Sequence, residues 1–343
     1  MLPFTRLRQS QRHNLREVIP LQKPFAITID PSSLCNYRCI HCLHGNDTLC
    51  RLIDKRLMQV ADFKRVIDDI AKWPGPKLKV IKLYNCGEPL LNPEFIVMLK
   101  YAKDANVSER IDLTSNCSLM TPRISAKLVE YELDYLRASI SSPIQERHER
   151  ITGSKVALGA ICDNLSHLRK VKTKRGSEKP FVAAKMFWSS SEEENRLFLE
   201  KFSAVADEVF FEKLHNFADF EGTDFIGSYY GNQPDEIVAP SDGHPVVKKA
   251  CPWPFMSLTV QSNGDTHACC VDWLGSTRVG NAFKQPIQEI WEGDTLFEFR
   301  RMQLENRRHE NASCRTCGVY LSDDFTVDNI DGFPVGELRR KDL

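Results

Sequence analysis

The pattern of apolar and polar positions between residues 25 and 214 alternates between short apolar runs and longer amphipathic segments. Short runs rich in β-branched and aromatic residues predict strands, and apolar residues at i, i+3, i+4 and i+7 predict helices. Phe63, Val66, Ile67 and Ile70 have this helical spacing. Strands are predicted at residues 25–29, 78–84, 111–114, 135–140, 181–187 and 208–214, and helices around 63–70, at 93–105, after Thr121, around 161–168 and at 192–206.

This order of elements predicts an α/β fold with six strand-then-helix units. Consecutive units of this kind form a parallel sheet with right-handed crossovers. Six units are too few for a closed eight-fold barrel, so we expect either a partial (β/α)6 TIM-like barrel or a doubly wound sheet. Both architectures place ligands at the carboxyl ends of the strands, and candidate chemistry is therefore sought there.

The pattern changes beyond about residue 215. Residues 221–246 are rich in Gly, Asp, Asn and Pro, which is typical of a loop or linker. Asn263-Gly264 between two apolar runs predicts a β-hairpin, and residues 287–301 predict a helix. The expected domains are a barrel over 1–215 with a short N-terminal extension over 1–24, a linker over 216–250, and a small hairpin-and-helix domain over 251–343.

Composition and charge exclude some classes of partner. The 46 Lys and Arg residues balance 46 Asp and Glu residues, so no global charge points to nucleic acid or an anionic membrane. No apolar run reaches the roughly 18 residues that span a bilayer, and the chain begins without a secretory pattern. We therefore expect a cytoplasmic protein whose cysteines stay reduced.

The twelve cysteines are the outlier in the composition, and three of them form the run Cys35-x3-Cys39-x2-Cys42 after the first strand. Three thiolates can hold three irons of a [4Fe–4S] cube and leave the fourth iron open, whereas ordinary electron-transfer clusters have four cysteine ligands. Structural zinc sites usually pair C-x2-C units, and disulfides need an oxidising compartment. An open iron–sulfur cluster fits best, with zinc or a chance grouping as the alternatives.

Segments at later strand ends make the chain resemble the radical S-adenosylmethionine (SAM) enzymes over residues 25–215. Cys86-Gly87-Glu88-Pro89 is similar to the family's Gly-Glu-Pro segment, with Cys86 where a first glycine is usual, and Thr114-Ser115-Asn116 follows the third strand. Without the resemblance, Glu88-Pro89 could be an ordinary turn and Ser139 a buried hydroxyl. The residues that the resemblance assigns to SAM binding are Tyr37, His41, Gly87, Glu88, Pro89, Asn116, Ser139 and Arg150.

The resemblance implies that SAM binds the open iron through its amino and carboxylate groups. A reduced cluster would then cleave SAM to a 5′-deoxyadenosyl radical, which abstracts hydrogen from an unactivated C–H bond. The cofactor carries this chemistry, and the protein orients the partners and excludes water. An external electron donor such as a flavodoxin or ferredoxin is also implied.

A second group of cysteines surrounds the predicted hairpin and helix. Cys251, Cys269, Cys314 and Cys317 resemble the "twitch" appendage, a shortened SPASM domain, which implies one auxiliary [4Fe–4S] cluster closed by four thiolates. Cys270 could replace Cys269 or act independently. A four-thiolate zinc site is the alternative.

The four-cysteine layout resembles that of twitch enzymes, which include an aminocyclitol dehydrogenase, and this resemblance implies a radical SAM oxidoreductase. The radical would abstract hydrogen from a small polar, sugar- or aminocyclitol-like substrate, and the auxiliary cluster would accept an electron. Residues near strand ends and the hairpin that could contact the substrate are Glu212, Lys213, His215, Asp272 and Trp273, with a solvent-facing charged run as the alternative.

Three other functions stay open. A related epimerase would quench the substrate radical with a cysteine hydrogen donor, for which Cys117 and Cys86 are candidates, although a buried inert thiol is the ordinary state of such a residue. A peptide-modifying SPASM enzyme usually carries a leader-binding domain, and the 34 residues before Cys35 are too few for one. The third alternative is an iron–sulfur or zinc protein without enzymatic activity.

Overall fold

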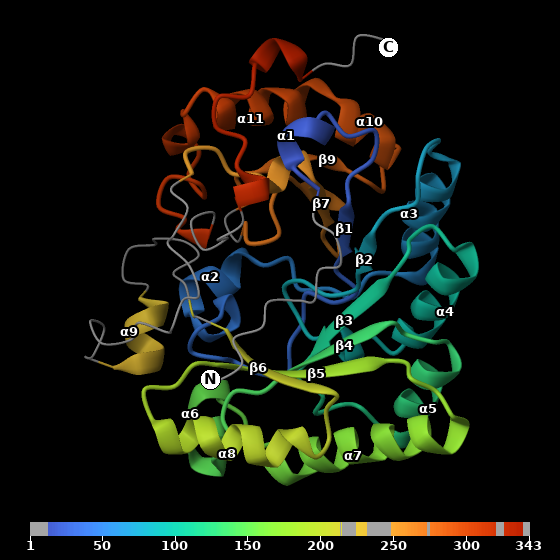
Figure 1. Ribbon diagram of the computed structural model, residues 1–343, viewed down its shortest axis with the longest axis vertical. Coiled ribbons are helices and arrows are strands. Elements are labelled where there is room, and N and C mark those ends of the chain that lie inside the picture. The colour runs from blue at the N-terminus through green and yellow to red at the C-terminus, as the bar shows by residue number, and fades with distance from the viewer. Residues whose placement is uncertain are drawn as a thin grey trace.

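The structure is a computed structural model that describes residues 13–212, 214, 224–231, 248–272, 275–319 and 326–338. The strands of this described part form one sheet in the order β6-β5-β4-β3-β2-β1-β7-β8-β9 (Figure 1). Their bounds are β1 Ala26–Ile29, β2 Val80–Lys82, β3 Ile111–Ser115, β4 Tyr135–Ser139, β5 Phe181–Phe187, β6 Glu208–Glu212, β7 Ser257–Val260, β8 Asp265–His267 and β9 Arg278–Asn281.

The first six strands pair in parallel and in chain order, as the alternation of strands and helices predicts. Helices cover one face of the sheet, and the sheet does not close (Figure 1). A partial barrel is therefore confirmed. The helices are α1 Leu15–Val18, α2 Asp47–Leu52, α3 Val60–Lys72, α4 Phe95–Ala105, α5 Pro122–Glu130, α6 Gln145–Thr152, α7 Leu158–Arg175, α8 Glu192–Ser203, α9 Phe225–Tyr230, α10 Ile287–Glu292 and α11 Asp294–Leu304.

Local chemistry sets several helix ends. The Thr121 hydroxyl accepts the backbone N–H of Ile124, and Pro122 occupies the first turn of α5, so this helix begins where the sequence predicts. Ser191 caps α8 through the N–H of Glu194 in the same way. These ends hold each helix in register behind its strand.

Strands β3 and β4 place apolar side chains toward the helices. Leu113 and Leu136 belong to the main hydrophobic core, together with the apolar faces of α3, α4, α5, α7 and α8. Because successive strand residues point to opposite faces, Thr114 and Arg137, which are paired in the β3–β4 register, lie on the inner face. The inside of the partial barrel therefore carries polar side chains beside a smaller apolar cluster that includes Tyr135 and Phe210.

The C-terminal hairpin continues the barrel sheet instead of forming a sheet of its own. β7 pairs in parallel with β1, with Ile27 opposite Leu258, and β8 and β9 follow in antiparallel order. The predicted hairpin is present, but β9 was not predicted from the sequence. In Figure 1, α10 and α11 lie at the end of the molecule opposite α7 and α8.

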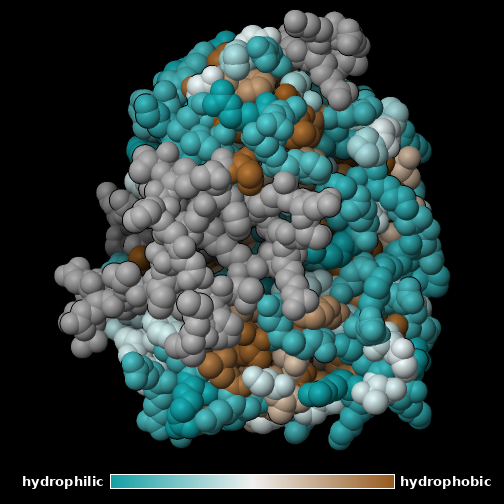
Figure 2. All heavy atoms as spheres, viewed as in Figure 1, coloured by the Kyte–Doolittle hydropathy of each residue, from teal (hydrophilic) through white to brown (hydrophobic). Residues whose placement is uncertain are grey.

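One expectation about this half of the chain was wrong, and one helix lies where no helix was expected. The single helix predicted over 287–301 is two helices, because Gly293 is extended (φ −72°, ψ 156°) and the Arg300 guanidinium donates to the Trp291 carbonyl at the break (3.2 Å). The linker predicted over 216–250 contains helix α9, which Asp224 caps by accepting from the N–H of Gly227. The visible described surface is mostly hydrophilic, with apolar side chains gathered in smaller areas (Figure 2).

Candidate active site

The loop after β1 carries Cys35, Cys39 and Cys42, and all three thiols are free. The loop is held against α6, where the Arg38 N–H donates to the Thr152 carbonyl (2.7 Å) and the Ile40 N–H to the Ile151 carbonyl (2.9 Å). Burial raises the pKa of Cys39, and the neighbouring Cys42 and Cys35 thiols raise it further. Soft thiols close enough to influence one another are the donor set that an iron–sulfur cluster requires.

Gly87 lets the loop after β2 pack directly on the cysteine loop. A Cβ atom at this position would lie 2.2 Å from the carbonyl oxygens of both Ser32 and Leu34. The next residue, Glu88, donates its backbone N–H to the Leu34 carbonyl at 2.8 Å. Only glycine allows this approach, so the Cys86-Gly87-Glu88-Pro89 segment lies against the cysteine loop.

The buried Glu88 carboxylate joins this segment to the end of β3. Its Oε1 accepts the Ser115 hydroxyl (2.8 Å) and the Leu90 N–H (3.0 Å), and its Oε2 accepts the Asn116 N–H (2.8 Å). Burial raises the pKa of Glu88, and these donors oppose that effect. Because protein donors occupy both oxygens, the side chain serves to hold the loop.

Asn116 completes the connection between the strand ends. Its side-chain amide donates to Asn36 Oδ1 in the cysteine loop (2.9 Å), and the Asn36 amide donates to the Ser118 hydroxyl (2.9 Å). The segments after β1, β2 and β3 therefore form one hydrogen-bonded unit. The structure brings Gly87, Glu88 and Asn116 together with the cysteine loop, as their positions at strand ends predict.

The other predicted SAM-binding residues differ in how deeply they are buried. The His41 ring meets Phe187 and Tyr229 edge-on, with centroids 5.0 and 5.4 Å away, and burial followed by the charge of Lys185 lowers its pKa to about 3. His41 is therefore neutral at pH 7. Tyr37 is buried, Pro89 begins a short 3-10 turn, Ser139 is half-buried at the end of β4, and Arg150 is exposed on α6.

The second group of cysteines lies between the loop before β7, the loop after β8 and the segment after α11. Burial raises the pKa of Cys251, and the Cys314 and Cys317 thiols raise it further. Cys251 in turn raises the pKa of Cys269, after the larger effects of Cys270 and burial. Cys251 is therefore the residue that connects the three other predicted ligands electrostatically.

Gln303 on α11 organises this group and was not predicted from the sequence. Its side chain is fully buried, accepts the Cys251 backbone N–H (3.4 Å) and donates to the Cys314 thiol (3.6 Å). A glutamine on the buried face of an amphipathic helix was the available signal, because a buried amide needs partners.

Cys270 is hydrogen-bonded to Cys269 through its side chain, which lowers the pKa of Cys270, and the charges of Lys82 and Arg137 on the inner face of the barrel lower it further. The Cys270 thiol also raises the pKa of Cys86, whose own thiol is 3.5 Å from Gln261 Oε1. The bonded pair of thiols therefore connects the second cysteine group with the barrel interior.

The other residues predicted to contact the substrate or donate hydrogen lie in different places. Cys117 is fully buried in the hydrophobic core, and its thiol donates to the Ser115 carbonyl (3.6 Å). Glu212 is ion-paired inside the barrel (3.1 Å to Arg137). Asp272 is buried and accepts from the Thr277 hydroxyl (2.7 Å). Lys213, His215 and Trp273 lie outside the described residues.

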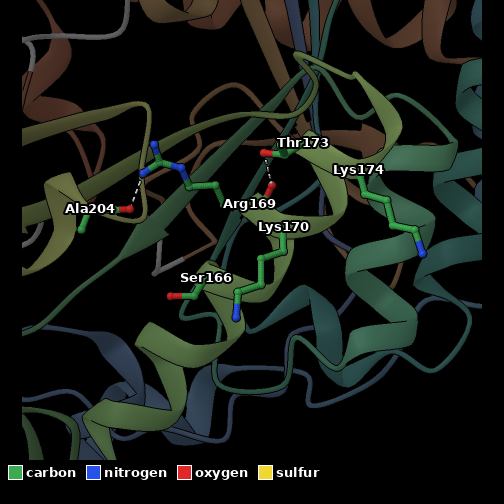
Figure 3. A pocket seen from close by; sticks show the side chains of 6 residues that line it. All are labelled: Ser166, Arg169, Lys170, Thr173, Lys174 and Ala204. Carbon is green, nitrogen blue, oxygen red and sulfur yellow. Dashed lines mark hydrogen bonds between the residues drawn. The ribbon is translucent and has the colours of Figure 1, made fainter.

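No group of three or more His, Cys, Asp or Glu side chains within the described ranges is arranged as a ready-made site for a metal ion. A pocket of about 490 Å³ lies on the outside of the barrel, along α7 (Figure 3). It is distant from the strand ends, and the Arg169 guanidinium beside it is bonded to the Ala204 carbonyl. We therefore place the candidate site at the strand ends. The pocket is lined by Ser166, Arg169, Lys170, Thr173, Lys174 and Ala204.

Comparison with known families agrees with this geometry. Residues 29–178 match the profile of the radical SAM superfamily, and residues 251–318 match the SPASM iron–sulfur cluster-binding domain. The AdoMet-dependent heme synthase of Methanosarcina barkeri is 24% identical over 341 residues, which cover 86% of this chain and 88% of that protein.

Two solved structures share the fold. BtrN in complex with AdoMet and 2-DOIA has a TM-score of 0.52 at 16% identity, over 85% of this chain and 92% of BtrN. Streptococcus suis SuiB bound to its precursor peptide SuiA has a TM-score of 0.59 at 16% identity, over 89% of this chain and 72% of SuiB.

The chain therefore carries a radical SAM domain followed by a SPASM domain, and it is a radical SAM enzyme. These domains imply SAM bound to a [4Fe–4S] cluster and auxiliary iron–sulfur binding. Among the described helices, none is both long and apolar enough to cross a membrane.

Proposed function

We propose that this chain is a cytoplasmic oxidoreductase acting on a small polar, sugar- or aminocyclitol-like molecule. The bound clusters and SAM supply a 5′-deoxyadenosyl radical for hydrogen abstraction and an acceptor for the electron that the substrate loses. An external flavodoxin- or ferredoxin-like protein provides the reducing electron. The observation that supports the proposal is that charges of the barrel interior act on both cysteine groups: Lys185 acts on Cys39, and Lys82 and Arg137 act on Cys270, the neighbour of Cys269.

Each group of site residues has its own role. Cys35, Cys39 and Cys42 hold the SAM cluster, and the backbone of Gly87 and Glu88 faces SAM. Cys251, Cys269, Cys314 and Cys317 hold the auxiliary cluster. Cys269 is preferred to Cys270 as the ligand because the Cys251 thiol acts on the pKa of Cys269, whereas the charges of Lys82 and Arg137 act on that of Cys270. Glu88, Asn116 and Gln303 position these ligands through the hydrogen bonds described above.

Oxidation is favoured over epimerisation by the environment of Cys117. Its thiol is packed among apolar side chains and bonded to a carbonyl of its own strand end, so it cannot reach a substrate without unpacking the core. A second thiol, Cys86, remains at the barrel interior. Product formed in deuterated water separates the two reactions, because a solvent-exchanged thiol would deliver deuterium to carbon, whereas oxidation would not.

The test is anaerobic reconstitution with iron and sulfide, followed by dithionite and SAM, with 5′-deoxyadenosine measured by chromatography. Wild type and the Cys162→Ala control on α7 should both cleave SAM, whereas Cys39→Ala should abolish cleavage. Cys269→Ala should lose the auxiliary cluster while keeping the first one. A protein that binds only zinc and forms no 5′-deoxyadenosine would exclude the proposal.

A further inference from the structure

The inner face of the partial barrel carries an excess of positive charge near the carboxyl ends of its strands. Lys82, Arg137 and Lys185 project from β2, β4 and β5, and within the described residues Glu212 is the carboxylate that ion-pairs with this set. Asp112, the other acidic residue on this face, is ion-paired with Arg110 at 2.7 Å. Burial raises the pKa of Asp112, and the charges of Arg110, Lys82 and Arg137 oppose that effect. With Arg110 counted, four cations therefore face two carboxylates among the described residues.

Lys185 is accounted for by its surroundings. Its ammonium is 3.2 Å from Glu212 Oε2, and its charge also lowers the pKa of the Cys39 thiol. A cation beside the cysteine triplet balances the negative charge that thiolate ligands bring to a cluster. Lys185 thus belongs to the iron–sulfur site already described.

The positive charges of Lys82 and Arg137 are only partly compensated. Lys82 makes no hydrogen bond or ion pair with any other described residue, and its ammonium lies 5.5 Å from the centroid of the Trp253 ring. The Arg137 side chain is only 19% exposed. Its Nε donates to the Thr114 hydroxyl (3.1 Å) and its Nη1 to Glu212 (3.1 Å), which leaves Nη2 without a partner in the described part of the chain.

The sheet register brings these two cations to one place. Lys82 is opposite Asp112 on β3, and Arg137 is opposite Thr114, two residues further along the same strand. Both point inward, because residues i and i+2 of a strand share a face. The Arg137 guanidinium also lies 5.5 Å from the Tyr84 ring centroid, just beyond Lys82 in the chain. Lys82 has no ion pair among the described residues, and Arg137 shares its carboxylate partner, Glu212, with Lys185. Half-buried positive charge that is incompletely compensated favours a ligand of the opposite charge.

We propose that Lys82 and Arg137 bind an anionic group of the substrate, a carboxylate or a phosphate, within the barrel. This inference rests on the proposed function and narrows its substrate class. A guanidinium offers a planar fork of donors to such a group, and an ammonium adds a point charge. A sugar acid or sugar phosphate would be attracted to this position, whereas a cationic aminocyclitol would be repelled.

Isothermal titration calorimetry on the anaerobically reconstituted enzyme, saturated with SAM, tests this binding directly. Saturation with SAM prevents a probe from occupying the SAM site. The probes are gluconate as a carboxylate, glucose 6-phosphate as a phosphate, glucose as the neutral form and glucosamine as the cationic form. At least one anionic probe should bind ten or more times tighter than glucose, and glucosamine should bind no better than glucose.

The variants assign that preference to the two residues. Lys82→Met should lower the affinity for the preferred anion at least tenfold. Arg137→Met combined with Glu212→Gln, which removes both members of the ion pair, should do the same. Lys79→Met, which alters an exposed lysine paired with Glu109 (2.6 Å), should leave the affinity unchanged. Cluster absorbance and circular dichroism verify that each variant is folded and loaded.

Equal affinity for glucose and both anions, no measurable anion binding, or an anion affinity that survives both sets of substitutions would overturn the inference. SAM cleavage by the wild-type enzyme is measured in the same preparation. Anion binding without SAM cleavage would reject the proposed function but not the anion site. SAM cleavage without anion preference would reject the anion site alone.

Discussion

Replacing Glu88 with glutamine should destabilise the loop that supports the SAM site, although the change alters a single atom. The Glu88 carboxylate receives three donors, from Ser115, Leu90 and Asn116. Glutamine retains one carbonyl oxygen, and its NH2 group must face at least one of these donors. A hydrogen bond to a charged acceptor contributes about 1.5–3 kcal/mol, and a stranded buried donor costs about 1–3 kcal/mol.

One effect opposes this loss. Burial raises the pKa of Glu88, which shows that the ionised form is itself disfavoured at this position, and a neutral amide avoids that penalty. We therefore expect a net decrease of about 2 kcal/mol in the free energy of unfolding, near the middle of the range for a lost hydrogen bond to a charged group.

Anaerobic urea denaturation followed by circular dichroism measures the change, and calorimetry measures SAM affinity, which should fall in parallel. The matched control is Glu94→Gln, because Glu94 is exposed and its side chain makes no capping hydrogen bond to α4. A Glu88→Gln protein within about 0.5 kcal/mol of that control would refute the reasoning, since surface substitutions usually stay within that range.

Three further predictions follow from the same geometry. Gly87→Ala should lower SAM affinity and iron content in reconstitution, because its Cβ would meet two carbonyl oxygens at 2.2 Å. Gly159→Ala, on the open face of α7, is the control. Unchanged SAM affinity of the Gly87→Ala protein would contradict this prediction. Cys269→Ala should lose the auxiliary cluster's iron, whereas Cys270→Ala should keep it, as iron analysis and electron paramagnetic resonance will show; equal losses would contradict the assignment. Burial raises the pKa of Asp30 to about 8, so its folded form holds a proton that the unfolded chain releases near pH 4, and this group's contribution to stability falls as pH rises between those values. Asp30→Asn should therefore flatten the stability profile from pH 5 to 8, by up to about 1.4 kcal/mol per pH unit, and an unchanged profile would show that Asp30 is ionised in the fold.

Much of the barrel was predictable because its signals are local. The run from 181 to 187 is a strand from Phe181 to Phe187, and Thr121 and Pro122 begin a helix where capping chemistry requires it. The cysteine triplet and the Gly87 segment follow strands, and parallel strands bring their carboxyl ends to one edge. The order of the elements thus implied where the site lies.

Other features depended on contacts between distant segments. The helix expected over 287–301 breaks at Gly293, where Arg300 bonds the freed carbonyl, and periodicity alone could not show that partner. Gln303 was unremarked because its role arises only when α11 packs against the loop of Cys251. Lys82 and Arg137 could have been noticed in the sequence, because charged residues within otherwise buried strands need a partner on the inner face.

The sequence by itself determined the class of chemistry, because ligand spacing and strand order are properties of neighbouring residues. It could not determine that the C-terminal hairpin joins the barrel sheet through β1 and β7, which pairs Ile27 with Leu258. Nor could it show that the Cys269 and Cys270 thiols bond to each other, with the Cys251 thiol acting on Cys269 and the barrel charges of Lys82 and Arg137 acting on Cys270. Those choices depend on long-range packing, in which a side chain's direction is set by elements far away in the chain.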